Sequence, residues 1–168
     1  MLVKILGAAV QGIDAIPVTI EVVAEYGFSF TMVGLPDTAV KESYQRVLAA
    51  VEQSGFEFPR RRVVVNLSPA DVRKEGAAYD LPIAVAALAA AEKLPAESLQ
   101  GVMIMGELSL DGSVLPIKGV LPMAILARSM GCKAMIIPKA NATEAAVVNN
   151  LDVVGVESLA EVVAHITG

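Results

Sequence analysis

The segment of residues 81–91 places the strongest limit on the fold, because almost every residue in it is apolar. Asp80 precedes it at the position of a helix N-cap, Pro82 fits the first turn of a helix, and small apolar residues continue to Leu94. A helix that is apolar on all faces must be covered on all faces. The sequence therefore predicts a central helix buried in one domain, and the run is too short to cross a bilayer.

The composition fits a densely packed core and limits the possible ligands. Of 168 residues, 55% are hydrophobic and 18% are charged, and the net charge is −5. This charge argues against a domain devoted to nucleic acid, because phosphate binding needs a positive field. The single Cys132 excludes an internal disulfide, and the single His165 leaves little for a zinc site. Both features fit a reducing cytoplasm, with Cys132 as a small buried residue rather than a reactive thiol.

The first residues, from Met1 to Pro17, have one Lys followed by apolar residues and so look superficially like a signal peptide. Asp14 and the alternating residues after Pro17 are more typical of paired strands. We therefore expect a cytoplasmic protein without a secretion signal.

Periodicity predicts strands throughout the first half of the chain and alternating helices and strands in the second half. No linker, repeat or low-complexity tract divides the chain, so residues 1–168 form one predicted domain. The order of elements predicts an α/β (α+β) sandwich of helices packed on a mixed β-sheet, rather than a doubly wound nucleotide-binding fold. Strands are predicted at residues 2–10, 17–25, 28–33, 62–67, 102–105, 134–137 and 153–154, a hairpin at 107–115, and helices at 38–51, 80–94, 119–130, 141–148 and 159–166.

The segment Gly34-Leu35-Pro36-Asp37 stops the third predicted strand. Gly and Pro are typical of a strand-to-helix turn, and Asp37 or Thr38 can cap the helix that follows. A docking loop is the alternative interpretation. Gly55 is predicted to end that helix in a left-handed conformation.

Familiar nucleotide-binding and catalytic motifs are missing from the chain. It has no G-x-x-x-x-G-K-[ST] pattern, and no two of its 13 glycines are separated by one residue, which excludes G-x-G-x-x-G. A Ser-His-Asp triad would have to use His165, which lies three residues from the end in a predicted helix and is expected to face solvent. The sequence thus predicts a non-catalytic part of something larger.

Two segments nevertheless look more like a site than like scaffolding, namely KEGAAYD at 74–80 and GELSLDGSVLPIKG at 106–119. Both are similar to active-site segments of the Lon protease domain. There, K-[DE]-G-P-S-A-G carries the nucleophilic Ser and G-E-[IL]-[ST]-L-x-G-x-V-L-P-I-G-G-L-K-E-K carries the Lys base. Position by position, the resemblance places Ala78 where the Ser stands and Leu121 where the Lys stands.

A Ser-Lys dyad needs a hydroxyl nucleophile and a desolvated amine, and neither Ala78 nor Leu121 supplies one. The resemblance implies a vestigial site with no catalytic residue, cofactor or metal of its own. Its groove either binds a peptide, a DNA strand or a neighbouring subunit, or persists as inherited structure. The alternative is a Lon-like serine peptidase with a rearranged dyad that recruits Lys118 with Ser68 or Ser113. The candidate groove residues are Lys74, Glu75, Gly76, Asp80, Glu107 and Lys118.

Five ordered, ungapped blocks resemble a second family. VGLPDTAVKES at 33–43 is similar to the V-G-L-P-[DE]-x-A-V-K-E-S signature of ComM-like proteins, also called the YifB or magnesium-chelatase-related family. The other blocks are SGFEFP at 54–59, VNLSPAD at 65–71, KEG at 74–76 and DLPIA at 80–84. The similarity extends from near Met1 to about Gly168.

In that family such a stretch is the amino-terminal Lon-like domain, and an AAA+ ATPase domain with its own P-loop follows. The resemblance implies a hexameric motor that uses ATP and Mg and acts on branched DNA in natural transformation and recombination. Its partners would be its own AAA+ domain, neighbouring subunits and DNA, without a membrane. Since this chain ends before any P-loop, we expect the ATPase domain downstream and an accessory or assembly role for the chain itself.

Arg60, Arg61 and Arg62 form the only basic run, and Arg73 lies on a loop that we expect to be nearby. These arginines are candidate contacts for DNA or for a neighbouring subunit. Acidic neighbours such as Glu57 dilute the field, so an ordinary charged entrance to a strand remains the alternative.

Overall fold

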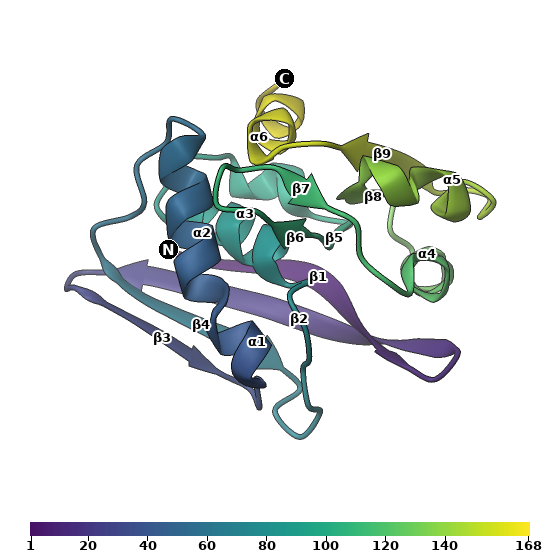
Figure 1. Cartoon of the computed structure of the whole chain (residues 1–168), viewed down its shortest axis with the longest axis horizontal. Coiled ribbons are helices and arrows are strands. Elements are labelled where there is room, and N and C mark those ends of the chain that lie inside the picture. Colours follow the sequence, from purple (N-terminus) through teal and green to yellow (C-terminus); the bar gives the residue numbers. More distant parts are fainter.

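The two halves of the chain build the two sides of one seven-stranded sheet, as the computed structural model shows for all 168 residues (Figure 1). The strand order is β3-β4-β2-β1-β5-β8-β9, and a separate two-stranded hairpin stands apart from it. The sheet strands are β1 (Leu2–Gln11), β2 (Asp14–Glu25), β3 (Ser29–Val33), β4 (Arg62–Ser68), β5 (Val102–Ile104), β8 (Ala134–Pro138) and β9 (Asp152–Val156), and the hairpin is β6 (Glu107–Leu108) with β7 (Val114–Leu115).

The helices α1 (Thr38–Lys41), α2 (Ser43–Gln53), α3 (Asp80–Ala90), α4 (Val120–Ser129), α5 (Ala142–Ala145) and α6 (Leu159–Thr167) pack around this sheet, with short 3₁₀ turns η1 (Ala96–Leu99) and η2 (Lys139–Asn141). In Figure 1, α2 and α3 lie together over strands β1 to β4, whereas α5 and α6 accompany β8 and β9, and α4 packs against β1 and β2 as well as β8. The predicted sandwich of helices on a mixed sheet is therefore confirmed.

Strand pairing explains why the sheet is mixed. β1, β2 and β4 pair antiparallel, and buried residues alternate along β2 and β4 because one face meets the helices. β3 joins β4 in parallel at one edge of the sheet, while β5, β8 and β9 are parallel to one another. β5 pairs with β1 at only one pair of residues, Leu6 and Met103, so most of the second half of β1 has no strand paired on that side.

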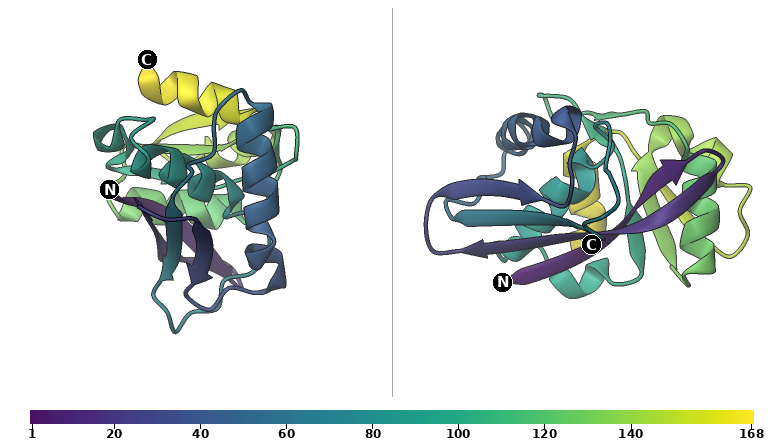
Figure 2. Two further views of the ribbon diagram at one scale, coloured as in Figure 1. Left: turned by 90° about the vertical axis from the view of Figure 1, so that its left-hand side faces the viewer. Right: turned by 90° about the horizontal axis from the view of Figure 1, so that it is seen from below.

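Helix α3 is the centre of the molecule, as predicted. All eleven of its residues are buried, and it packs against β1, β2 and α2. Figure 2 shows it enclosed between the strands and the outer helices. Two details of the prediction were wrong. The helix ends at Ala90 rather than Leu94, because Glu92 adopts a left-handed backbone with φ of 63°. Its N-cap is Tyr79, and the Asp80 carboxylate bonds to other elements instead.

Two other predicted helices differ in length. The helix predicted at 38–51 is interrupted at Glu42, which divides it into α1 and α2. Its start was correct, since the Asp37 carboxylate accepts the Val40 N–H at 2.8 Å, and Gly55 has the left-handed φ of 87° expected after its end. The helix predicted at 141–148 is reduced to the single turn α5. No helix in the structure combines the length and apolarity needed to span a membrane.

Candidate functional site

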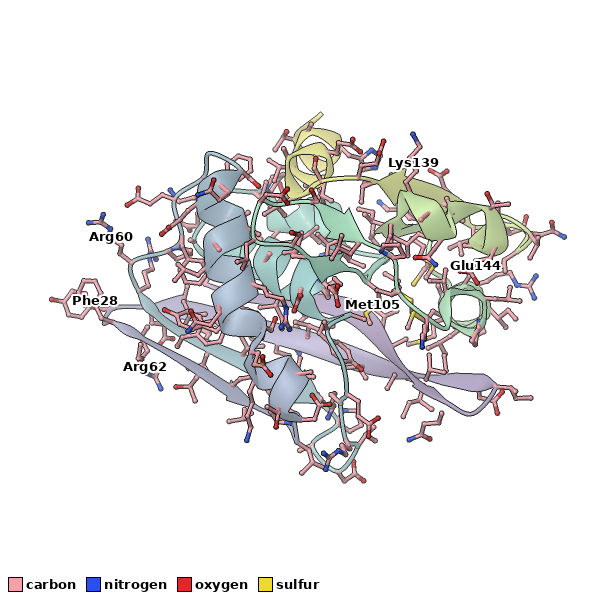
Figure 3. All side chains as sticks on the ribbon, in the orientation of Figure 1. Phe28, Arg60, Arg62, Met105, Lys139 and Glu144 are labelled. Atoms are coloured by element: carbon pink, nitrogen blue, oxygen red, sulfur yellow. The ribbon has the colours of Figure 1, made fainter.

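A cavity of about 710 Å³ opens where the end of β1, the loop before α3 and the segment before α4 converge. The loop contributes Gly76, Ala77 and Ala78, and β1 contributes the residues from Ala8 to Gln11. Met105, labelled in Figure 3, is a buried residue of the lining, and Lys118 lines the cavity from the segment before α4. We call this cavity the groove.

The floor of the groove is made where two sequence motifs meet, although they are nearly 40 residues apart. The Lys74 backbone N–H donates to the Leu35 carbonyl at 3.1 Å, and the Asp37 N–H donates to the Lys74 carbonyl at 2.9 Å. The Lys74 ammonium is fully buried and donates to the Gly34 carbonyl at 2.7 Å and to the Pro69 carbonyl. Burial lowers the pKa of Lys74. These bonds join the two loops into one rigid unit.

Asp37 has a second role in the same unit. One carboxylate oxygen caps α1, and the other accepts the Gly76 N–H at 3.2 Å. The turn interpretation of residues 34–37 thus accounts for Asp37 within the fold. A side chain at Gly34 would place a Cβ 2.1 Å from the Leu67 carbonyl oxygen, which explains why a glycine stands there.

The loop that carries Ala78 is fixed to the β5–β6 connection by two backbone hydrogen bonds. The Gly106 N–H donates to the Ala78 carbonyl, and the Leu81 N–H donates to the Gly106 carbonyl, each at 2.9 Å. The buried Tyr79 hydroxyl donates to the Ala8 carbonyl at 3.1 Å, and burial raises the pKa of Tyr79. Ala78 therefore stands on a well-defined surface of the groove.

A buried ion pair supports the loop from below. The Arg46 guanidinium donates to both oxygens of the Asp80 carboxylate, at 2.6 and 3.0 Å, and to the Ala39 carbonyl at 2.7 Å. The carboxylate also accepts the Leu108 N–H at 3.1 Å. Burial raises the pKa of Asp80, and the bonds from Arg46 and Leu108 oppose that shift. The hydrogen bond with Asp80 raises the pKa of Arg46. This pair connects α2, α3 and the hairpin.

Four of the six candidate groove residues line the cavity, namely Glu75, Gly76, Glu107 and Lys118, and so does Ala78. The other two, Lys74 and Asp80, are buried beneath it and serve as supports. Leu121 does not line the groove and is 37% exposed on α4.

The structure does not bring the four candidate arginines together. Arg60 and Arg61 lie beside another hollow, at the connection between α2 and β4, and Arg62 begins β4. Arg73 lines the groove beyond the opposite end of β4, and seven residues of strand span about 20 Å. Arg73 also pairs with Glu75 at 3.4 Å.

Several residues that shape the groove carried no sequence signal of their own. Arg46 sits on an ordinary helix, and only the fold reveals that Asp80 is its partner. The sequence pattern predicted a strand at β1, but nothing in that pattern indicated that the end of β1 lines a cavity. Tyr79 was counted in a polar loop, although it is 3% exposed. The structure brings no three His, Cys, Asp or Glu side chains together as a metal site.

Comparison with known proteins identifies the family. A family model described as subunit ChlI of Mg-chelatase matches residues 20–141. The chain is 42% identical over 161 residues to the competence protein ComM of Haemophilus influenzae, covering 95% of this chain and 31% of that protein. It is 41% identical over 161 residues to YifB of Escherichia coli, covering 95% and 32% respectively.

Lon proteases are more distant relatives. The archaeal Lon protease of Thermococcus kodakarensis is 35% identical over 102 residues, which covers 60% of this chain and 16% of the protease. The chain spans about a third of the length of the ComM and YifB relatives that it matches. With its Lon-like α/β fold, the chain belongs to the magnesium-chelatase-related AAA+ family, as a domain of the ComM and YifB type.

Proposed function

We propose that this chain is a non-catalytic accessory and assembly domain of an ATP-driven motor that remodels branched DNA. The groove is built from segments that resemble a Lon-type active site, and its role would be structural or in substrate handling rather than in peptide hydrolysis. The motor would be a hexamer in the cytoplasm, with ATP and Mg bound by an AAA+ domain outside these residues. Its action would be branch migration during natural transformation and recombination.

One observation carries the non-catalytic part of the proposal. The residues that line the groove include no Ser, Thr, Cys or His. The only hydroxyl is that of Tyr79, which is buried and bonded to the Ala8 carbonyl. Covalent hydrolysis by a dyad needs a nucleophile within hydrogen-bond reach of its base. Ala78 occupies the place of the nucleophile by sequence, and nothing else in the lining replaces it.

The rearranged-dyad alternative has little geometric support. Ser68 ends β4 and is paired in the sheet with Thr19, while the Ser113 N–H bonds to Asp111 in the hairpin turn. Neither serine lines the groove that Lys118 lines. A peptidase with either serine would therefore require a different arrangement of these loops.

The DNA part of the proposal rests on the family. The relative from Haemophilus is named for competence, and the resemblance described above implies a motor for branched DNA. The groove itself offers no strong field for a nucleic acid, because Asp37, Glu75 and Glu107 line it together with Arg73 and Lys118. The groove is therefore better suited to a neighbouring domain or subunit than to a DNA strand.

A peptidase assay tests the first part. The purified chain is incubated with unfolded casein and with a fluorophosphonate probe, with an active Lon protease as positive control. We expect no cleavage and no labelling. Cleavage that disappears in Ser68→Ala or Ser113→Ala would show that the alternative is correct.

A junction assay tests the second part. The complete gene product is mixed with a labelled four-way DNA junction and ATP, and its oligomeric state is measured by native mass spectrometry. We expect a hexamer and ATP-dependent resolution of the junction into two duplexes. A gene product that hydrolyses no ATP and leaves the junction intact would refute the motor.

A further inference from the structure

The aromatic side chains of the chain are gathered at one end. The sequence has only seven, four Phe and three Tyr, and five of them surround the β2–β3 turn and the connection between α2 and β4. Together with the basic run they form what we call the aromatic-arginine surface. Its members are Tyr26, Phe28, Phe30, Tyr44, Phe58, Arg60, Arg61 and Arg62.

Two of these rings have no packing role. Tyr26 is fully exposed, at 102% of its reference area, and Phe28 is 85% exposed. They flank Gly27 in the turn between β2 and β3, and Figure 3 shows Phe28 projecting from the end of the molecule near Arg60 and Arg62. Single exposed apolar residues such as Ile13 are ordinary, but Tyr26 and Phe28 stand on either side of one turn and so form a patch.

The other three rings form a stacked base beside them. Phe30 and Tyr44 stack with centroids 4.4 Å apart at an interplanar angle of 29°, and Phe58 meets Tyr44 edge-on at 6.1 Å. These rings line a hollow of about 390 Å³, and Phe28, Arg60 and Arg61 also line it. The surface thus combines flat apolar faces with guanidinium groups.

The arginines are only loosely engaged. Arg60 pairs with Glu57 at 3.2 Å and Arg62 with Glu25 at 3.7 Å, and all four side chains are more than half exposed. Exposed pairs of this kind are weak, so both guanidiniums are free to turn toward an anion. Arg61 forms no ion pair at all.

We propose that the aromatic-arginine surface binds single-stranded DNA. Bases would stack on Tyr26 and Phe28 and extend the Phe30–Tyr44 stack, while Arg61 and its neighbours contact the phosphates. Aromatic platforms with arginines are the usual means of holding unpaired bases without reading their sequence. This inference rests on the proposed function, because a motor on branched DNA exposes unpaired strands near its fork.

The observations favour a single strand over a duplex. A duplex hides the faces of its bases, so exposed rings gain nothing from it. A duplex also depends on a continuous positive field, whereas here Glu25, Glu52 and Glu57 lie beside the three arginines, so stacking has to supply most of the affinity. Aromatic residues and Arg are also enriched in protein interfaces, so a second copy of the chain is the competing partner that the test below must exclude.

Fluorescence anisotropy with a labelled oligo-dT of about 20 nucleotides tests the proposal. We expect the double variant Tyr26→Ala/Phe28→Ala to bind at least about tenfold more weakly than the wild type, since each stacked base contributes measurably to affinity. The control Ile13→Ala/Val147→Ala removes two residues that are 90% and 69% exposed elsewhere, and should bind like the wild type.

Charge gives two further readouts. Glu57→Gln removes the acid that engages Arg60 and should tighten binding several-fold. Because few phosphates are neutralised, the slope of log affinity against log salt should be small, about −1 to −2. A matched duplex of the same length should bind more weakly than the single strand.

The inference is wrong if the wild-type chain does not bind oligo-dT, or if the double variant binds it as well as the wild type does. It is also wrong if the double variant instead abolishes self-association in sedimentation, since the partner would then be a second copy. The motor is tested separately with the four-way junction. If the complete gene product resolves the junction but Tyr26→Ala/Phe28→Ala binds oligo-dT like the wild type, only the proposed role of this surface is refuted. If the chain binds oligo-dT but the complete gene product does not act on the junction, only the proposed motor is refuted.

Discussion

Removal of either partner of the Arg46–Asp80 ion pair should destabilise the fold, and the two losses should be unequal. Arg46→Met removes both bonds to the carboxylate and the bond to the Ala39 carbonyl. It leaves Asp80 fully buried with only neutral groups beside it, the Leu108 N–H and the buried Ser43 hydroxyl. Breaking a buried pair by removing one partner costs about 3–5 kcal/mol, and this variant should lie in that range.

Asp80→Asn should cost less, about 1.5–3 kcal/mol, for two reasons. The amide is neutral and keeps an oxygen for the Leu108 N–H. The Arg46 side chain is 21% exposed, so its charge can turn toward water, whereas the Asp80 side chain is fully buried. In the double variant Arg46→Met/Asp80→Asn the buried charge is gone, so its cost should be less than the sum of the two single costs.

Urea unfolding followed by circular dichroism measures these free energies, with Lys4→Met as the control. Lys4 forms an exposed pair with Glu21 at 3.6 Å, and its loss should cost at most about 1 kcal/mol. The reasoning is refuted if Arg46→Met costs less than the control, or if Asp80→Asn costs more than Arg46→Met.

The pH dependence provides an independent check of the same pair. Burial already raises the pKa of Asp80 above its ordinary value of 3.8, and loss of Arg46 removes the strongest opposing interaction. The folded state of Arg46→Met then binds the Asp80 proton more tightly than the unfolded state does. The free energy of unfolding of Arg46→Met should therefore rise as the pH falls from 8 toward 5. The difference in free energy of unfolding between this variant and the wild type should then become smaller. If the difference in free energy of unfolding between the wild type and Arg46→Met instead grows on acidification, the Asp80 carboxylate is not buried as described.

Three further predictions concern single sites. Gly34→Ala should cost at least about 2–3 kcal/mol in urea unfolding, because φ is 105° and the new Cβ would meet the Leu67 carbonyl; Gly55→Ala, at a φ of 87° with open space around it, should cost only about 1 kcal/mol. Burial lowers the pKa of Lys74, so the folded state binds that proton less tightly than the unfolded state does, and the wild-type free energy of unfolding should rise relative to that of Lys74→Met as the pH rises toward 10.5; equal pH slopes in the two proteins would count against a buried ammonium. Cys132 is 7% exposed and burial raises its pKa, so a thiol reagent should label it at least about tenfold more slowly in the native protein than in urea, and equal rates would disprove its burial.

The sequence was sufficient for features that depend on local patterns. Alternation along β2 and β4 and the apolar run in α3 each record which faces are covered, so the layers of the fold followed from them. The cap at Asp37 and the left-handed Gly55 followed from turn chemistry in the same way.

Features that depend on distant partners could not be predicted. Asp80 has the residue type and position of an N-cap, yet its carboxylate bonds to Arg46, 34 residues earlier in the chain. The break at Glu42 leaves a helical pattern intact in the sequence, so periodicity did not reveal it. Arg73 looked close to the basic run because only the chain separation was visible, whereas β4 carries it to the other end of the sheet.

This difference bears on where function should be sought. The residues that carry the family signature have structural duties: Gly34 avoids the Leu67 carbonyl, Asp37 caps a helix and holds Gly76, and Lys74 satisfies buried carbonyls. Their presence is explained by the fold without any ligand.

Tyr26 and Phe28 are the opposite case, because the fold gains nothing from two exposed rings. Leaving such area in water forgoes the stabilisation that burial of an aromatic side chain provides, about 1.5–3 kcal/mol for each ring. A residue whose exposure the fold does not require is better explained by a partner than by packing. The signature residues around the groove are accounted for by the fold, so the aromatic-arginine surface is where a partner should be sought.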